Sequence, residues 1–145
     1  MPDYNAKRAI IGHLEKGADL YDSILRVAQE NRVRVGRVTG MGAVQRAQLA
    51  YYDQQAMKYC NRGFNEAMEI VSLYGNISMK EGRPFAHVHV VLSNERGECK
   101  GGHLLPGATP VFACEVMIEE FAGPEPVRNA DPTTGLALWP KEWIL

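Results

Sequence analysis

Three histidines, His87, His89 and His103, are the strongest candidates for a metal site, because imidazole is the commonest metal ligand among side chains. His87 and His89 lie two residues apart in the predicted strand 85–92, so both should point to one face of a sheet. His103 lies in 98–105, which we expect to be the returning strand of a hairpin. Three converging imidazoles would give a divalent metal three ligands and leave its fourth position open, and zinc is the first expectation.

The turn between the two strands decides whether the histidines converge. Asn94-Glu95-Arg96-Gly97 is typical of a type I turn followed by a left-handed glycine. Such a turn pairs Asn94 with Glu98, and counting back along the ladder sets His89 opposite His103. A longer loop, or a bulge at Gly101-Gly102, would turn His103 to the other face. The alternative to a metal site is that the histidines only hydrogen-bond across a sheet or at a subunit contact.

Glu115 is the one candidate for a catalytic role, and it interrupts an otherwise apolar predicted strand, 110–121. A buried carboxylate is costly without a partner, so we expect Glu115 to have one. It could accept a hydrogen bond from a ligand imidazole or act as a general base. It could equally pair with an arginine at a subunit contact, and the sequence leaves these roles open.

Four glycines and an asparagine are candidate ligand contacts: Gly40, Gly42, Gly101, Gly102 and Asn76. The first two lie in a predicted turn, 39–43, that could line a pocket; no capped helix follows, which excludes a phosphate-binding loop. The second pair would allow a ligand or a neighbouring strand to approach closely. Ordinary turn chemistry explains the asparagine as well as ligand contact does.

The pattern of elements predicts an α+β domain with one main helix and a largely antiparallel or mixed sheet of about seven strands. Asp19 can cap a helix that runs to about Asn31 with apolar residues at helical spacing on one side. A polar stretch, 54–65, lies between the predicted strands 44–52 and 67–79. The expected strands are 9–14, 33–38, 44–52, 67–79, 85–92, 98–105 and 110–121.

Length and composition indicate a single domain, 1–145, with its core at about 8–121. Residues 122–145 are rich in Pro, Asp, Asn and Thr, and we expect this tail to wrap over the surface, pinned by Trp139 and Trp143. The three cysteines, which form no CxxC pair, suggest neither a disulfide framework nor a thiolate zinc site; Cys99 is a marginal ligand candidate at most. A reduced, cytoplasmic protein is the expectation.

The net charge of −1 shows no electrostatic signature of binding to nucleic acid or to an anionic membrane. No apolar run approaches the roughly 18 residues of a membrane-spanning helix.

Several short motifs, in order, resemble the plant and prokaryote conserved (PPC or PCC) domain over roughly residues 8–121. They are Gly17-Ala18-Asp19-Leu20, Thr39-Gly40-Met41-Gly42-Ala43, Glu69-Ile70-Val71-Ser72-Leu73-Tyr74-Gly75-Asn76-Ile77, His87-Val88-His89-Val90 with Gly101-Gly102-His103-Leu104, and Ala113-Cys114-Glu115-Val116. The resemblance implies a sheet flanked by little helix and assembly as a homotrimer. In plant members the domain follows AT-hook segments of DNA-binding regulators. Free-standing prokaryotic members resemble this chain more, and some look like metal-containing proteins.

Three functions remain open. The first is a metal-binding, homotrimeric binding or regulatory module, for which DNA binding is implied by the resemblance alone. The second is a metal-dependent hydrolase or lyase acting on a small anionic molecule, in which the metal lowers the pKa of bound water. The third is a sensor whose metal anchors a small anionic ligand. The sequence does not choose among them.

Overall fold

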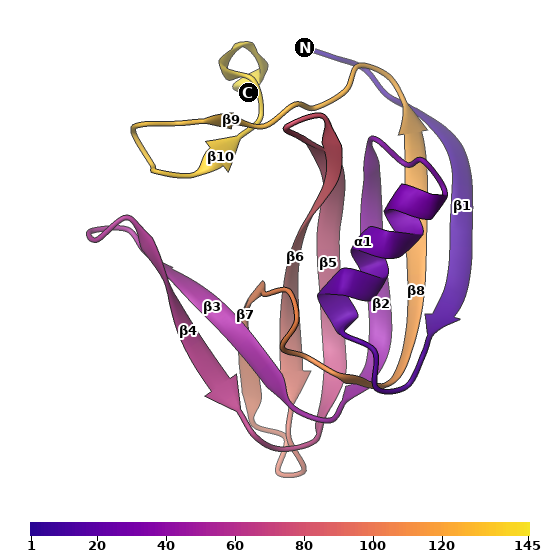
Figure 1. The fold of residues 1–145 in the computed structure, drawn as a ribbon, viewed down its shortest axis with the longest axis vertical. Helices are drawn as coiled ribbons and strands as arrows, with labels where there is room; N and C mark the ends of the chain where they lie inside the picture. Colours follow the sequence, from indigo (N-terminus) through magenta and orange to yellow (C-terminus); the bar gives the residue numbers. More distant parts are fainter.

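The computed structural model, which describes residues 1–145, contains one eight-stranded sheet, one α-helix and a small two-stranded sheet near the C-terminus (Figure 1). All neighbouring strands of the large sheet are antiparallel, and their order is β1-β8-β2-β5-β6-β7-β3-β4. This confirms the predicted α+β class with a mostly antiparallel sheet, although the sheet has eight strands instead of about seven. The strands are β1 (Asn5–Leu14), β2 (Gly36–Val44), β3 (Ala47–Asp53), β4 (Lys58–Phe64), β5 (Met68–Lys80), β6 (Arg83–Ser93), β7 (Cys99–Leu104) and β8 (Val111–Ala122).

Strand β4 is the one that the sequence did not predict, since it lies in the polar stretch 54–65. It pairs only with β3 and forms the edge of the sheet, and most of its side chains are exposed. An edge strand with little burial carries no apolar alternation, so its sequence looks like a loop.

The predicted turn at 39–43 is wrong, because β2 runs through it without reversing. The register of β2 against β5 shifts between Gly40 and Gly42, as in a β-bulge. A Cβ atom at Gly42 would lie 2.1 Å from the carbonyl oxygen of Ala113 on β8, and its φ of +146° also favours glycine. These glycines therefore let two strands approach closely instead of reversing the chain.

Helix α1 (Leu20–Glu30) covers one face of the sheet and has the N-cap that the sequence predicted. The Asp19 carboxylate accepts hydrogen bonds from the backbone N–H groups of Asp22 at 2.9 Å and Thr109 at 2.8 Å. Leu20 and Ile24 are fully buried. On the facing strand β6, the residues packed in the same core are Ala86, Val88, Val90 and Leu92. The alternate residues of β6 must then point to the opposite face of the sheet.

That opposite face has no helix over it, and we call it the open face. Large apolar side chains are exposed there, and they include Ile11 at 70%, Met41 at 61% and Tyr74 at 58%. Met117, which is paired with Ile11, belongs to the same face.

Residues 123–145 form a C-terminal strap that contains β9 (Asn129–Ala130), β10 (Ala137–Leu138) and a short 3₁₀ helix (Lys141–Trp143). In Figure 1 the strap, in yellow, lies at one end of the sheet beside the tip of the β3–β4 hairpin. The Tyr52 hydroxyl of β3 donates to the carbonyl of Thr134 at 2.5 Å. Trp143 packs edge-on against Tyr4 with ring centroids 6.4 Å apart, so the strap is held near its middle and near its C-terminus.

No helix in this fold combines the length and the apolar character that crossing a membrane requires.

Candidate metal centre

The β6–β7 hairpin has the turn geometry that the sequence predicted. The Asn94 N–H donates to the Glu98 carbonyl at 3.1 Å, and the Gly97 N–H donates to the Asn94 carbonyl at 2.9 Å. Gly97 has a φ of +76°, and the Asn94 side chain accepts from the Arg96 and Glu98 N–H groups. His89 and His103 are consequently direct partners in the antiparallel ladder.

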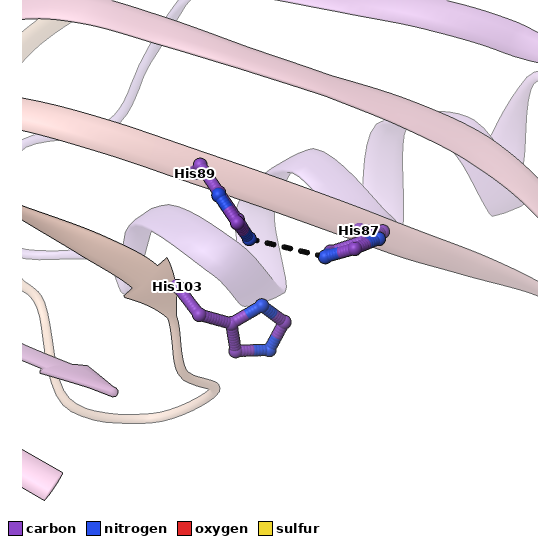
Figure 2. Close-up of side chains that lie close together, drawn as sticks. All are labelled: His87, His89 and His103. Carbon is purple, nitrogen blue, oxygen red and sulfur yellow. Dashed lines mark hydrogen bonds between the residues drawn. The ribbon is translucent and has the colours of Figure 1, made fainter. Parts of the chain in front are cut away.

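The rings of the three histidines converge on the open face (Figure 2). Ring centroids are 5.0 Å apart for His87 and His89, 5.1 Å for His87 and His103, and 5.5 Å for His89 and His103. One ring nitrogen from each residue lies within 4.8 Å of the others. Around a zinc ion, with Zn–N bonds of about 2.0–2.1 Å, tetrahedral ligand nitrogens lie about 3.3 Å apart. The three side chains can thus close on a metal with small rotations.

The Nδ1 atom of His103 is the best indication that hydrogen bonds between the rings do not account for the whole cluster. His87 Nε2 and His89 Nε2 are 3.1 Å apart, which one hydrogen bond between the rings explains. His103 Nδ1 is buried and has no hydrogen-bond partner, and no other buried side-chain nitrogen or oxygen shares this condition. Leaving such an atom unpaired costs about 1–3 kcal/mol. A metal ion fits this donor set, because it would satisfy that nitrogen.

The surroundings of the cluster keep the imidazoles of His87 and His103 neutral. Burial lowers the pKa of His87 to about 4, and electrostatic repulsion from Arg128 and His89 acts in the same direction. Burial likewise lowers the pKa of His103 to about 4, helped by His87, His89 and Arg128. Both residues are therefore in the deprotonated form that binds metals at neutral pH.

Two neighbours of the cluster were missed by the sequence analysis. Tyr59 of β4 stacks on His103 with ring centroids 4.7 Å apart. Arg128 of the strap donates from Nη2 to the Asn76 side-chain oxygen at 2.9 Å, and Asn76 is the cross-strand partner of His87. Both residues come from segments that look like polar loops in the sequence, and only the fold brings them to the histidines.

Of the five predicted ligand contacts, the fold places some near the histidines and others away from them. Asn76 lies within β5 instead of a turn, beside His87. Gly101 and Gly102 lie on β7, and a Cβ at Gly102 would be 2.8 Å from the carbonyl oxygen of Ala50, so its close approach serves the neighbouring strand β3. Gly40 and Gly42 lie on β2, two strands away from β6, and do not reach the histidines.

The expected burial of Glu115 is wrong. Its side chain is exposed, with no ion pair or hydrogen bond, because Cys114 and Val116 take the inward positions of β8. It lies opposite His13 on β1, and three strand spacings of about 4.8 Å separate β8 from β6. At roughly 14 Å, Glu115 can neither orient a ligand imidazole nor act as a base at the cluster.

The profile of the Plants and Prokaryotes Conserved (PCC) domain matches residues 1–122. The chain belongs to this family. A metal-containing protein from Archaeoglobus fulgidus has the same fold with a TM-score of 0.91 and 37% identity, over 97% of this chain and 99% of that one. A plant- and prokaryote-conserved protein from Pyrococcus horikoshii has a TM-score of 0.90 and 29% identity, over 96% and 95% of the two chains.

The chain also aligns with a curated relative, the bifunctional protein GlmU of a Synechococcus strain, at 28% identity over 120 residues. That match covers 82% of this chain and 18% of GlmU, so the chain spans less than a fifth of that protein's length. The family match ends at residue 122, so the strap with Arg128 lies beyond it.

Proposed function

We propose that His87, His89 and His103 hold one divalent metal ion and that the chain is a metal-dependent binding module. The observation that carries the proposal is the buried, unpartnered Nδ1 of His103, on a ring that converges with those of the other two histidines (Figure 2). The 37% identity to a metal-containing archaeal protein supports it.

Zinc is the first choice of metal. Imidazole suits zinc, copper, iron and nickel, whereas calcium and magnesium prefer oxygen ligands. Three protein ligands with one open position are usual for zinc sites that take a further ligand. A bound zinc ion would supply Lewis acidity and a positive charge at this place.

A binding role is better supported than catalysis. The hydrolase or lyase alternative needs a group that moves protons, and its one candidate, Glu115, lies on another strand and far from the histidines. No carboxylate is among the groups that shift the pKa of His87 or His103.

The family resemblance implies a homotrimer, and the open face supports association of this kind. Exposed apolar patches on a sheet mark contacts between proteins, and Ile11, Met41 and Tyr74 are such residues here. Light scattering should give about three times the 16.1 kDa chain mass. A mass of one chain at micromolar concentration would contradict the trimer.

DNA binding forms no part of the proposal. It is implied by the family resemblance, but 16 basic against 17 acidic residues give the chain no excess of positive charge. Phosphate contacts are strongest at low salt, so duplex binding measured there decides the matter. Duplex binding that weakens steeply with added salt would support a DNA-binding function.

Metal analysis of protein purified without an affinity tag tests the proposed function. We expect close to one metal ion per chain in the wild type and almost none in a His87→Ala, His89→Ala double variant. The matched control is His13→Ala, an exposed histidine on β1 that should leave the metal content unchanged. A wild type without metal, or a double variant that keeps it, contradicts the proposal.

A further inference from the structure

Arg128 carries a buried positive charge for which the protein supplies no counter-ion. Its residue is only 9% exposed, and none of the five ion pairs includes it. Its hydrogen-bond acceptors, Ser78 Oγ at 2.8 Å, the Ala137 carbonyl at 2.8 Å and Asn76 Oδ1 at 2.9 Å, are all neutral. Burying a charge without an opposite charge is costly, so this arrangement needs an explanation.

The guanidinium of Arg128 lies next to the histidine cluster. Asn76, which it contacts, is the direct cross-strand partner of His87. The guanidinium also lies over the ring of Phe85 at 5.3 Å, and Phe85 precedes His87 by two residues on the same strand and face. Its charge contributes to the lowered pKa of both His87 and His103.

No carboxylate contributes to the pKa of His87, of His103 or of Arg128. The groups that lower the pKa of His87 and His103 are Arg128 and the histidines themselves. Burial lowers the pKa of Arg128, and the groups that oppose this are the tyrosines Tyr59 and Tyr21, with no carboxylate among them. A divalent metal on three neutral imidazoles would add two more positive charges.

The contacts of Arg128 within the protein use only part of its hydrogen-bonding capacity. Two of the five N–H donors of the guanidinium hold the strap against β5 through Ser78 and Asn76, and a third bonds the Ala137 carbonyl within the strap. The guanidinium also lies over the ring of Trp139, 5.7 Å from its centroid. One N–H on each terminal nitrogen has no acceptor. Two free donors on a buried cation beside a metal site suit the oxygens of an anion.

We propose that Arg128 is the anion-binding residue of the histidine site, and that the ligand of the site is a small oxyanion, carboxylate or phosphate, bound between the metal and the guanidinium. This inference rests on the proposed metal site. The anion supplies the missing negative charge, and the strap holds the arginine in place.

Calorimetric titration of zinc-loaded protein, freed of excess zinc, tests this inference, with inorganic phosphate and acetate as separate ligands. Arg128→Gln should weaken binding of the better ligand at least tenfold, whereas its zinc content should stay close to that of the wild type. The matched control, Arg26→Gln, removes an exposed arginine of α1 on the other side of the sheet and should change nothing. If Arg128→Gln does not fold, Arg128→Lys keeps the charge and loses the planar fork, and it should weaken binding several-fold.

The outcomes separate the two proposals, because zinc is measured in the same samples. Stronger binding of phosphate or of acetate identifies the chemical class of the oxyanion. If the wild type holds zinc but binds neither anion, or if both Arg128 variants bind as the wild type does, the anion proposal fails and the metal site stands. If the wild type holds no zinc, both proposals fail.

Discussion

His89 and His103 face each other directly across the β6–β7 ladder, so the third imidazole of the cluster comes from the neighbouring strand at fixed register. The Cβ atoms of such a pair lie about 4.5–5.5 Å apart. The alternate residues of β6 are buried in the core against the helix, so His87 and His89 must point to the open face. The site is thus built on the rigid sheet, not on a loop.

His103→Phe should separate stability from metal binding. The new ring keeps the contact with Tyr59 but removes the unpartnered buried nitrogen, so the metal-free variant should gain about 1 kcal/mol in the free energy of unfolding. The same variant should lose its stabilisation by zinc. Urea unfolding with chelator and with zinc measures both effects. A stable variant that still responds to zinc would exclude His103 as a ligand.

Metal should stabilise the folded wild type. Free zinc at about 100 times the dissociation constant should add about 2.7 kcal/mol to the free energy of unfolding, if zinc binds only the folded chain. Thermal unfolding over a series of buffered zinc concentrations measures this dependence. The His87→Ala, His89→Ala double variant is the control, and an equal response in both proteins would place the zinc elsewhere.

The histidine hairpin could be predicted from the sequence because its determinants are local. Strand parity places His87 and His89 on one face, and the turn from Asn94 to Gly97 fixes the register that brings His103 opposite His89. The capped helix after Asp19 was predictable for the same reason.

The remainder of the site depends on contacts between distant segments. Tyr59 lies on an edge strand without apolar alternation, and Arg128 lies in a polar tail. Nothing in the sequence near either residue indicates that it lies beside the histidines. The exposure of Glu115 could not be predicted, because an apolar run does not distinguish a strand buried on both faces from one with an open face.

Gly42→Ala should destabilise the fold although Gly42 is far from the histidines. The added Cβ would meet the Ala113 carbonyl oxygen at 2.1 Å and the Cys114 Cα at 2.7 Å, so β2 and β8 must separate. We expect a loss of about 3 kcal/mol in the free energy of unfolding. Gly63→Ala is the matched control, since nothing lies within 4 Å of its added Cβ. Urea unfolding of the metal-free proteins measures both, and equal stabilities would refute the packing role.

Glu120 should make part of the stability depend on acid pH. Burial raises the pKa of Glu120, but the hydrogen bonds and charges of Lys7 and Arg8, at 2.8 Å and 2.5 Å, outweigh burial and hold the pKa below its ordinary value. The folded-state pKa is thus lower than the unfolded one. Its contribution is complete above the unfolded pKa and is lost as the pH falls through the folded pKa.

Glu120→Gln should accordingly cost about 2 kcal/mol at pH 7 and much less at pH 3. The control is Glu119→Gln, because the Glu119 side chain is 31% exposed against 6% for Glu120, and its effect should stay within about 0.5 kcal/mol. Urea unfolding from pH 3 to 7 measures both. A cost for Glu120→Gln that does not change with pH would argue against an ionised, paired Glu120.

A crystal structure of the zinc-loaded protein, with anomalous diffraction collected at the zinc absorption edge, tests the metal site most directly. We predict one strong peak per chain, within about 2.0–2.1 Å of His87 Nε2, His89 Nε2 and His103 Nδ1. A map of fully loaded protein with no peak between these three rings, or with its peak on other residues, would contradict it.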